Sequence, residues 1–221
     1  MIWRANASVA TRSVRRTWSG IGIGCLMLLA AASSHGQAYC SLRDPMVALN
    51  KAFPSFDHHR SIVREVSEDH RDKILDRLPF TIHRNELGSH TLYAAFDSSD
   101  RLLGLIHVRT ERGRWGLTEI AWTLGPDLRI DGLRFQRSRE SGQAEIESET
   151  FQAQVRGLGF VEIRAFLDQD GSLRTEGGIE VPVNARPLAE DTLRSALKTI
   201  AATEIVWGRE LVKLRGPDGP G

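Results

Sequence analysis

The residues best suited to bind a ligand form a short run at the end of a predicted strand. Alternate residues of a β-strand share one face of its sheet, and this run places Leu133, Phe135, Arg137 and Arg139 at alternate positions. The face therefore changes from apolar to basic. Two guanidinium groups at the rim of an apolar layer could bind a phosphate or carboxylate. The alternative, which composition alone favours, is that the strand ends earlier and both arginines are solvated.

A second group of residues could complete such a site. Glu140, Ser141 and the glycine that follows form a predicted polar turn that could offer a hydroxyl and backbone N–H groups. Trp115 lies in another predicted turn, between glycines, where its ring could stack on a flat ligand. Trp122 is in phase with apolar neighbours and is predicted to belong to the core. The candidate binding site for a flat ligand with a phosphate group comprises Arg137, Arg139, Glu140, Ser141 and Trp115.

Four segments have the alternating pattern of β-strands. Residues 91–96, 102–110, 116–124 and 128–138 alternate between apolar and polar positions, and short polar turns separate them. Such short connections join antiparallel neighbours, so the four strands are predicted to form a meander.

Helical patterns precede and follow this meander. Asp44 and Ser67 are predicted N-caps of two helices that end at prolines. A third pattern ends at Gly157, and a last helix is predicted to start near Pro187 and to end before Gly208.

The pattern as a whole predicts an α+β fold, in which helices pack on an antiparallel β-meander. Residues 160–167 fit either a strand or a helix. A single domain is expected over residues 39–208, followed by a disordered tail over residues 209–221.

Residues 1–38 are predicted to be a secretory signal, which makes the protein periplasmic. A basic region without acids, an apolar run over residues 21–32 and small residues before the expected cleavage point match such a signal. The run is shorter than the about 20 residues of a comfortable membrane span, so an uncleaved anchor is the minority alternative. The pair Arg15 and Arg16 raises the twin-arginine export route as an alternative to general secretion.

Charge and cysteine content limit the partners and the redox chemistry. Removal of the four arginines in the signal changes the formal net charge from +1 to −3, which gives no electrostatic reason to bind nucleic acid. Cleavage after Ala38 leaves Cys40 as the one cysteine of the exported chain. An internal disulfide is therefore excluded, and a free thiol is expected.

Motifs of common enzyme classes do not occur in this sequence. We find no phosphate-binding P-loop, dinucleotide fingerprint, nucleophile elbow or paired-cysteine metal site. The remaining candidate for a metal site is the group Asp57, His58 and His59, with Glu65 and His70 downstream. Because adjacent histidines point apart, a polar loop between two helices is predicted there instead. No catalytic residue and no metal ligand are assigned.

Two segments resemble a known family. The sequences KAFPSF and GLTEIAWTLGPDLRIDGLRFQRSRESG are similar to the periplasmic FMN-binding domain of Rnf- and Nqr-type electron-transport subunits and of related nitrous-oxide regulators. The resemblance covers residues 48–141. Residues 126–132 match the family's Asp-Gly turn, and Glu140 and Ser141 stand where the family has a Glu-Thr pair near the flavin. It implies FMN as cofactor, electron transfer as function, and a redox partner or a membrane electron-transport complex.

One departure from the family changes the expected mode of binding. The family attaches FMN to a threonine in a Ser/Thr-Gly-Ala-Thr motif, which this chain lacks. Thr192 is the nearest threonine, and the acids beside it would repel a phosphate. Either FMN binds without a covalent bond, or the scaffold remains without flavin. The two expected functions are thus a periplasmic flavin protein of electron transfer and a non-catalytic secreted binding or adaptor protein.

Overall fold

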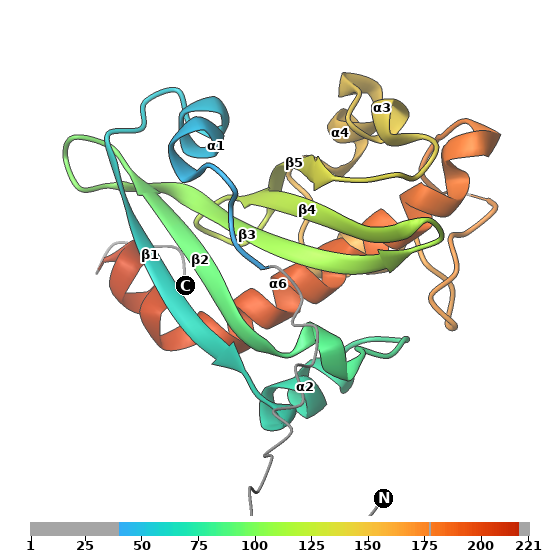
Figure 1. Cartoon of the computed structure of the whole chain (residues 1–221), viewed down its shortest axis with the longest axis horizontal. Helices are drawn as coiled ribbons and strands as arrows, with labels where there is room; N and C mark the ends of the chain where they lie inside the picture. Colours follow the sequence, from blue (N-terminus) through green and yellow to red (C-terminus); the bar gives the residue numbers. More distant parts are fainter. Residues whose placement is uncertain (1–39, 177, 217–221) are drawn as a thin grey trace, which may run out of the picture. The chain divides into compact units, whose positions relative to one another are not determined.

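The structure, a computed structural model that describes residues 40–176 and 178–216, contains a five-stranded sheet (Figure 1). The strands pair in chain order, each antiparallel to the next, and are β1 (His58–Val66), β2 (Gly88–Phe96), β3 (Leu102–Gly113), β4 (Gly116–Leu124) and β5 (Ile130–Arg137). The last four confirm the predicted meander, and the helices on the sheet confirm the α+β fold. The predicted signal lies outside the described residues. Within the described ranges, no helix has both the length and the apolar character needed to cross a membrane.

The first strand corrects a prediction. Residues 58–66, expected to be a polar loop, pair with β2 along their whole length, from His58 opposite Phe96 to Val66 opposite Gly88. Val66 is the one residue of β1 that is buried, so the strand lacks the apolar alternation that identifies a half-buried strand in a sequence. Its position at the edge of the sheet explains this composition.

Helix α6 (Arg186–Arg215) covers one face of the sheet. Every residue from Ser195 to Thr203 is buried, because the strands cover one side of this helix while α2 (Glu68–Leu75) and α5 (Phe160–Arg164) pack against it elsewhere. The larger hydrophobic core lies between α6 and the strands, around Trp122. The prediction that this helix ends before Gly208 is wrong: Gly208 lies inside α6, so residues 209–215 are helical instead of belonging to a tail.

Helix α1 (Pro45–Ala52) lies on the opposite face of the sheet (Figure 1). Asp44 is its N-cap, as predicted, and accepts a hydrogen bond from the backbone N–H of Val47 at 3.1 Å. A second, smaller hydrophobic cluster packs between this helix and the sheet around Leu49, Phe53 and Ile106. This face is only partly covered, which leaves room for a groove.

Short helices connect the sheet to α6. The helical pattern that ends at Gly157 forms two helices, α3 (Gln143–Ile146) and α4 (Glu149–Val155), because Ser148 caps a new helix by accepting from the backbone N–H of Phe151. Helix α5 shows that the ambiguous residues 160–167 begin as a helix. Two 3-10 turns, Arg84–Glu86 and Val183–Ala185, complete the fold.

The C-terminal half of α6 also holds the edge strand. The indole N–H of Trp207 donates to the backbone carbonyl of Ile62 in β1 at 3.0 Å, and Trp207 is fully buried. An ion pair between Arg64 and Glu210 lies one turn further along. The edge of the sheet is thus tied to the helix by a buried and an exposed contact.

Replacing Gly208 tests the corrected end of α6. A Cβ at this helical position would meet no atom within 4 Å, so Gly208→Ala is expected to raise the free energy of unfolding by about 0.5–1 kcal/mol. Gly157 has the same open surroundings but a φ of +77°, so Gly157→Ala is expected to lower it by about 1 kcal/mol. Urea unfolding of both variants measures the difference. Destabilisation by Gly208→Ala would contradict a continuous helix.

Candidate functional site

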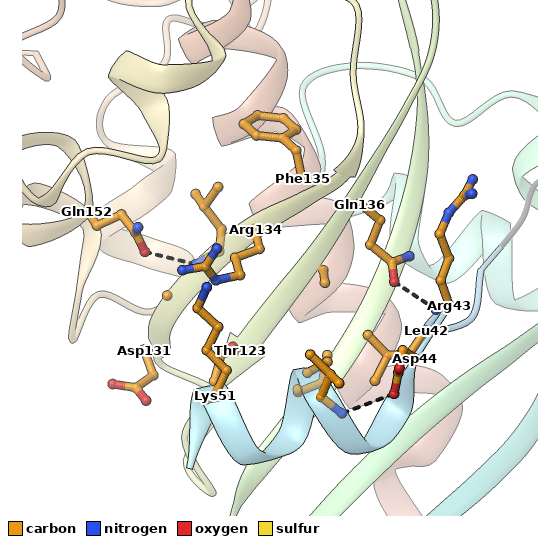
Figure 2. A pocket seen from close by; sticks show the side chains of 17 residues that line it. Leu42, Arg43, Asp44, Lys51, Thr123, Asp131, Arg134, Phe135, Gln136 and Gln152 are labelled. Carbon is orange, nitrogen blue, oxygen red and sulfur yellow. Dashed lines mark hydrogen bonds between the residues drawn. The ribbon is translucent and has the colours of Figure 1, made fainter. Parts of the chain in front are cut away.

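The candidate site is a groove between α1 and the strands β4 and β5 (Figure 2). Its volume is about 500 Å³, within the range of small-molecule binding sites. The apolar lining comes mainly from the second hydrophobic cluster and from α1: Leu42, Val47, Ala48, Ala52, Ile106 and Ala121. The groove therefore offers an apolar surface next to polar side chains.

Two cations from separate elements meet at this groove. Lys51 is in the last turn of α1 and Arg134 is in β5, and Figure 2 shows their charged ends pointing toward one another. Within the described ranges, neither side chain has a hydrogen-bond or ion-pair partner. Asp131 also lines the groove, but its carboxylate is directed away from the two cations in Figure 2. Because like charges repel, this arrangement is suited to an anion bound between them.

Two amide side chains hold the walls of the groove. Gln136 of β5 accepts from the backbone N–H of Arg43 at 2.9 Å and donates to the carbonyl of Ser41 at 3.1 Å, which ties β5 to the segment before α1. Gln152 of α4 accepts from the backbone N–H of Leu133 at 3.1 Å. These contacts within the chain fix the walls of the groove, so a ligand would meet a preformed site.

The strand register changes the prediction for Arg137. Phe135 pairs with Ile120, but Arg137 pairs with Glu119, because a β-bulge inserts one extra residue at Gln136. Arg137 therefore lies on the opposite face from Leu133 and Phe135, so the predicted single face that changes from apolar to basic is wrong. The Arg137 guanidinium is 3.9 Å from Glu119, a buried carboxylate that Arg43 binds at 2.8 Å.

The structure brings together two of the five predicted site residues. The backbone N–H of Trp115, in the β3–β4 turn, donates to the Glu140 carboxylate at 2.7 Å. Arg139 and Ser141 are exposed beside Glu140 in the chain. None of the five lines the groove or the two smaller cavities described by the structure. Sequence reasoning instead missed Lys51 and Arg134, which lie in different elements and carry no shared pattern.

A buried cluster of four charges lies on the other face, between β3 and α6. Lys198 of α6 donates to Glu86 at 3.0 Å and to Glu111 at 2.6 Å, while Arg109 donates to Glu86 at 2.6 Å. Burial would raise the pKa of Glu86, but Arg109 and Lys198 outweigh it and lower this pKa below its usual value. Burial would likewise lower the pKa of Arg109, which Glu86 and Glu111 raise instead. Glu86 and Arg109 are therefore both charged and neutralise one another.

Two buried histidines extend this polar layer. His90 lies 3.4 Å from His107, and His107 contacts the Thr203 hydroxyl of α6 at 2.8 Å. Burial, reinforced by Arg109, lowers the pKa of His90 to about 3, and burial lowers the pKa of His107 well below its usual value. Both rings are neutral near pH 7. The sequence does carry a signal for this layer: polar residues occupy the alternate positions 107, 109 and 111 of β3 and therefore share one face of the strand.

Asp191 lies at the mouth of this cluster. It lines a cavity of about 190 Å³ together with Glu86, Glu111 and Lys198. Burial, with nearby acids adding to it, raises the pKa of Asp191 to about 6. Proton uptake by this carboxyl is therefore expected in the mildly acidic range.

Two further residues singled out in the sequence, Thr192 and Cys40, are both buried. Thr192 is fully buried, with its hydroxyl unpaired, so it cannot carry a phosphoester without opening the core. Cys40 is buried, and burial raises the pKa of its thiol. The described part of the chain holds no group of three or more His, Cys, Asp or Glu side chains placed to bind a metal ion.

Comparison with known proteins assigns no family. No protein-family model matches the chain, and the curated proteins give no significant match. The function is therefore argued from the groove and the charge arrangement.

Removing the central cation of the buried cluster, Lys198, should destabilise the fold strongly. Lys198→Met leaves Glu86 and Glu111 facing each other with Arg109 alone to compensate, and we expect a loss of about 3 kcal/mol or more in unfolding free energy at pH 7. Lys213→Met, an exposed position on the same helix, is the control and should change it by less than about 0.5 kcal/mol. Equal midpoints in urea would show that the cluster does not stabilise the fold.

The raised pKa of Asp191 makes the stability of the fold depend on pH with a known sign. Above its unfolded-state pKa near 4 and up to about 6, the folded state retains a proton that the unfolded state has lost, so stability falls as pH rises through this window. Asp191→Asn should therefore raise the melting temperature above pH 6 and leave it nearly unchanged below pH 4. The exposed Glu176→Gln is the control. Stabilisation of equal size at both pH values would contradict the assignment.

Proposed function

We propose that this chain is an exported, non-catalytic binding protein whose groove holds a small ligand with an apolar body and an anionic group. The observation that carries the proposal is the convergence of Lys51 and Arg134, both without a partner in the described residues, over an apolar lining. Lysine binds phosphate as a point charge, and arginine can donate two parallel hydrogen bonds to it. The preformed walls lower the entropic cost of binding.

Non-covalent FMN is the first ligand to test. It joins a flat ring system to a phosphate, and the volume of the groove lies in the range that such ligands occupy. Ala48 and Ala121 could contact the ring while Lys51 and Arg134 hold the phosphate. The buried position of Thr192 argues against attachment there. When bound, flavin would supply one- or two-electron transfer, and the chain's residues would orient it and exclude water.

The cellular role follows from which ligand binds. With FMN, the protein would be a periplasmic electron carrier or an accessory module of a redox complex, and its partner would be a membrane electron-transport complex. Without FMN, it would be a binding or adaptor protein that keeps the scaffold. Because none of the five predicted flavin contacts lines the groove, the role as a binding or adaptor protein without FMN is favoured.

A comparison of two double variants tests where a flavin binds. We expect Lys51→Ala with Arg134→Ala to weaken FMN binding by roughly tenfold or more, because each charge-assisted hydrogen bond contributes about 1.5–3 kcal/mol. Arg137→Ala with Arg139→Ala, at the site predicted from the sequence, should leave the affinity nearly unchanged. The measurement is quenching of flavin fluorescence on titration, preceded by a visible absorbance spectrum of the exported protein.

Riboflavin is the matched ligand control because it lacks the phosphate. Its affinity should not change in the Lys51 and Arg134 variant, whereas a general collapse of the groove would weaken both ligands. Loss of FMN binding in the Arg137 and Arg139 variant alone would place the flavin at the other site. Absence of binding by both flavins would exclude the flavin reading and leave the adaptor reading.

A further inference from the structure

The β3–β4 hairpin ends in an exposed aromatic turn. Pairing continues to Gly113 opposite Gly116, so Arg114 and Trp115 alone form the turn. Trp115 is 59% exposed, and Leu117, the second residue of β4, is 43% exposed. The other two tryptophans of the described residues, Trp122 and Trp207, are buried. An exposed tryptophan and leucine at this turn create an apolar point that no other apolar side chain of the described residues covers.

Arginines lie next to this apolar point: Arg112 pairs with Leu117, Arg114 precedes Trp115, and Arg139 precedes the Glu140 that contacts the turn. All three are exposed, and none has a carboxylate partner in the described parts of the chain. The guanidinium of Arg114 lies over the Trp115 ring, 5.2 Å from its centroid. Glu140 is the acid that contacts the turn, and its carboxylate is occupied by the backbone N–H of Trp115. We define the hairpin tip as Arg112, Arg114, Trp115, Leu117 and Arg139.

The hairpin tip is held in position instead of being a loose loop. The bond from the Trp115 backbone to Glu140 ties the turn to the segment after β5. A Cβ at Gly113 would lie 2.4 Å from the Glu140 carboxylate, which shows how closely this acid packs under the turn. The ring of Trp115 is therefore presented outward on a fixed backbone, which lowers the entropy lost on docking.

We propose that the hairpin tip docks on an anionic lipid surface. Tryptophan prefers the headgroup level of a membrane, where its ring is buried and its N–H stays hydrated. Each arginine near an anionic surface contributes about 1 kcal/mol of attraction. The attraction is local: the exported chain has a formal charge of −3, but the hairpin tip presents three exposed arginines to such a surface. A single exposed aromatic ring offers no stacking row for single-stranded nucleic acid.

The docking surface is independent of the groove. None of its five residues lines the groove, so loss of FMN binding would leave this proposal intact. Docking would place the protein beside a membrane without a spanning segment, as a peripheral contact of modest affinity.

Vesicle sedimentation of the exported protein tests the proposal. We expect it to sediment with vesicles of equal parts phosphatidylglycerol and phosphatidylcholine, to stay in solution with pure phosphatidylcholine, and to be released by high salt. The emission of Trp115 should shift to shorter wavelength on binding. Trp115→Ala should reduce partitioning by about tenfold, and Arg114→Ala by roughly fivefold. Val183→Ala and Arg84→Ala, exposed apolar and basic positions elsewhere, should leave partitioning unchanged.

Three results would overturn the proposal. The first is no sedimentation with anionic vesicles. The second is sedimentation that Trp115→Ala and Arg114→Ala leave unchanged, which would assign binding to another part of the chain. The third is binding to a single-stranded oligonucleotide without binding to vesicles. Circular dichroism of Trp115→Ala checks that the fold is retained, and Leu117→Ala provides a second, milder apolar variant.

Discussion

The buried charge cluster between β3 and α6 is the constraint on which the rest of the structure depends. Lys198 must meet Glu86 and Glu111 while Arg109 meets Glu86, and a shift of α6 along its axis would leave buried charges unpaired. Hydrophobic packing alone tolerates sliding more readily than such directional contacts do. The cluster thus fixes the long helix on one face of the sheet. The short helix α1 then covers only part of the other face, which leaves the groove open.

The elements that the sequence predicts are those whose local pattern decides their structure. Strands β2 to β5 carry the apolar residues that the core buries, and the caps Asp44 and Ser67 mark true helix starts. Strand β1 escapes prediction because its edge position leaves it mostly wet. Gly208 misleads for a different reason: glycine often follows a helix end, but tertiary packing of Trp207 and Leu211 on the sheet and its neighbours carries α6 through it.

The candidate site depends on tertiary features that a single sequence does not contain. The bulge at Gln136 moves Arg137 to the other face, and no residue type signals a bulge there. Lys51 and Arg134 come together only because α1 packs across the strands, far from its position in the chain. The two arginines predicted from the sequence lie elsewhere. Arg137 faces the buried carboxylate of Glu119, and Arg139 belongs to the hairpin tip.

The contact between Trp207 and the carbonyl of Ile62 has a consequence for self-association. An unprotected edge strand offers its backbone to a second chain, which is a route to strand-swapped dimers and fibrils. A buried indole already bonded to that backbone, with Arg60, Arg64 and Glu65 along the same strand, makes such pairing unfavourable. The helix that supports the core therefore also occupies a backbone acceptor of this edge strand, which makes pairing with a second chain less favourable.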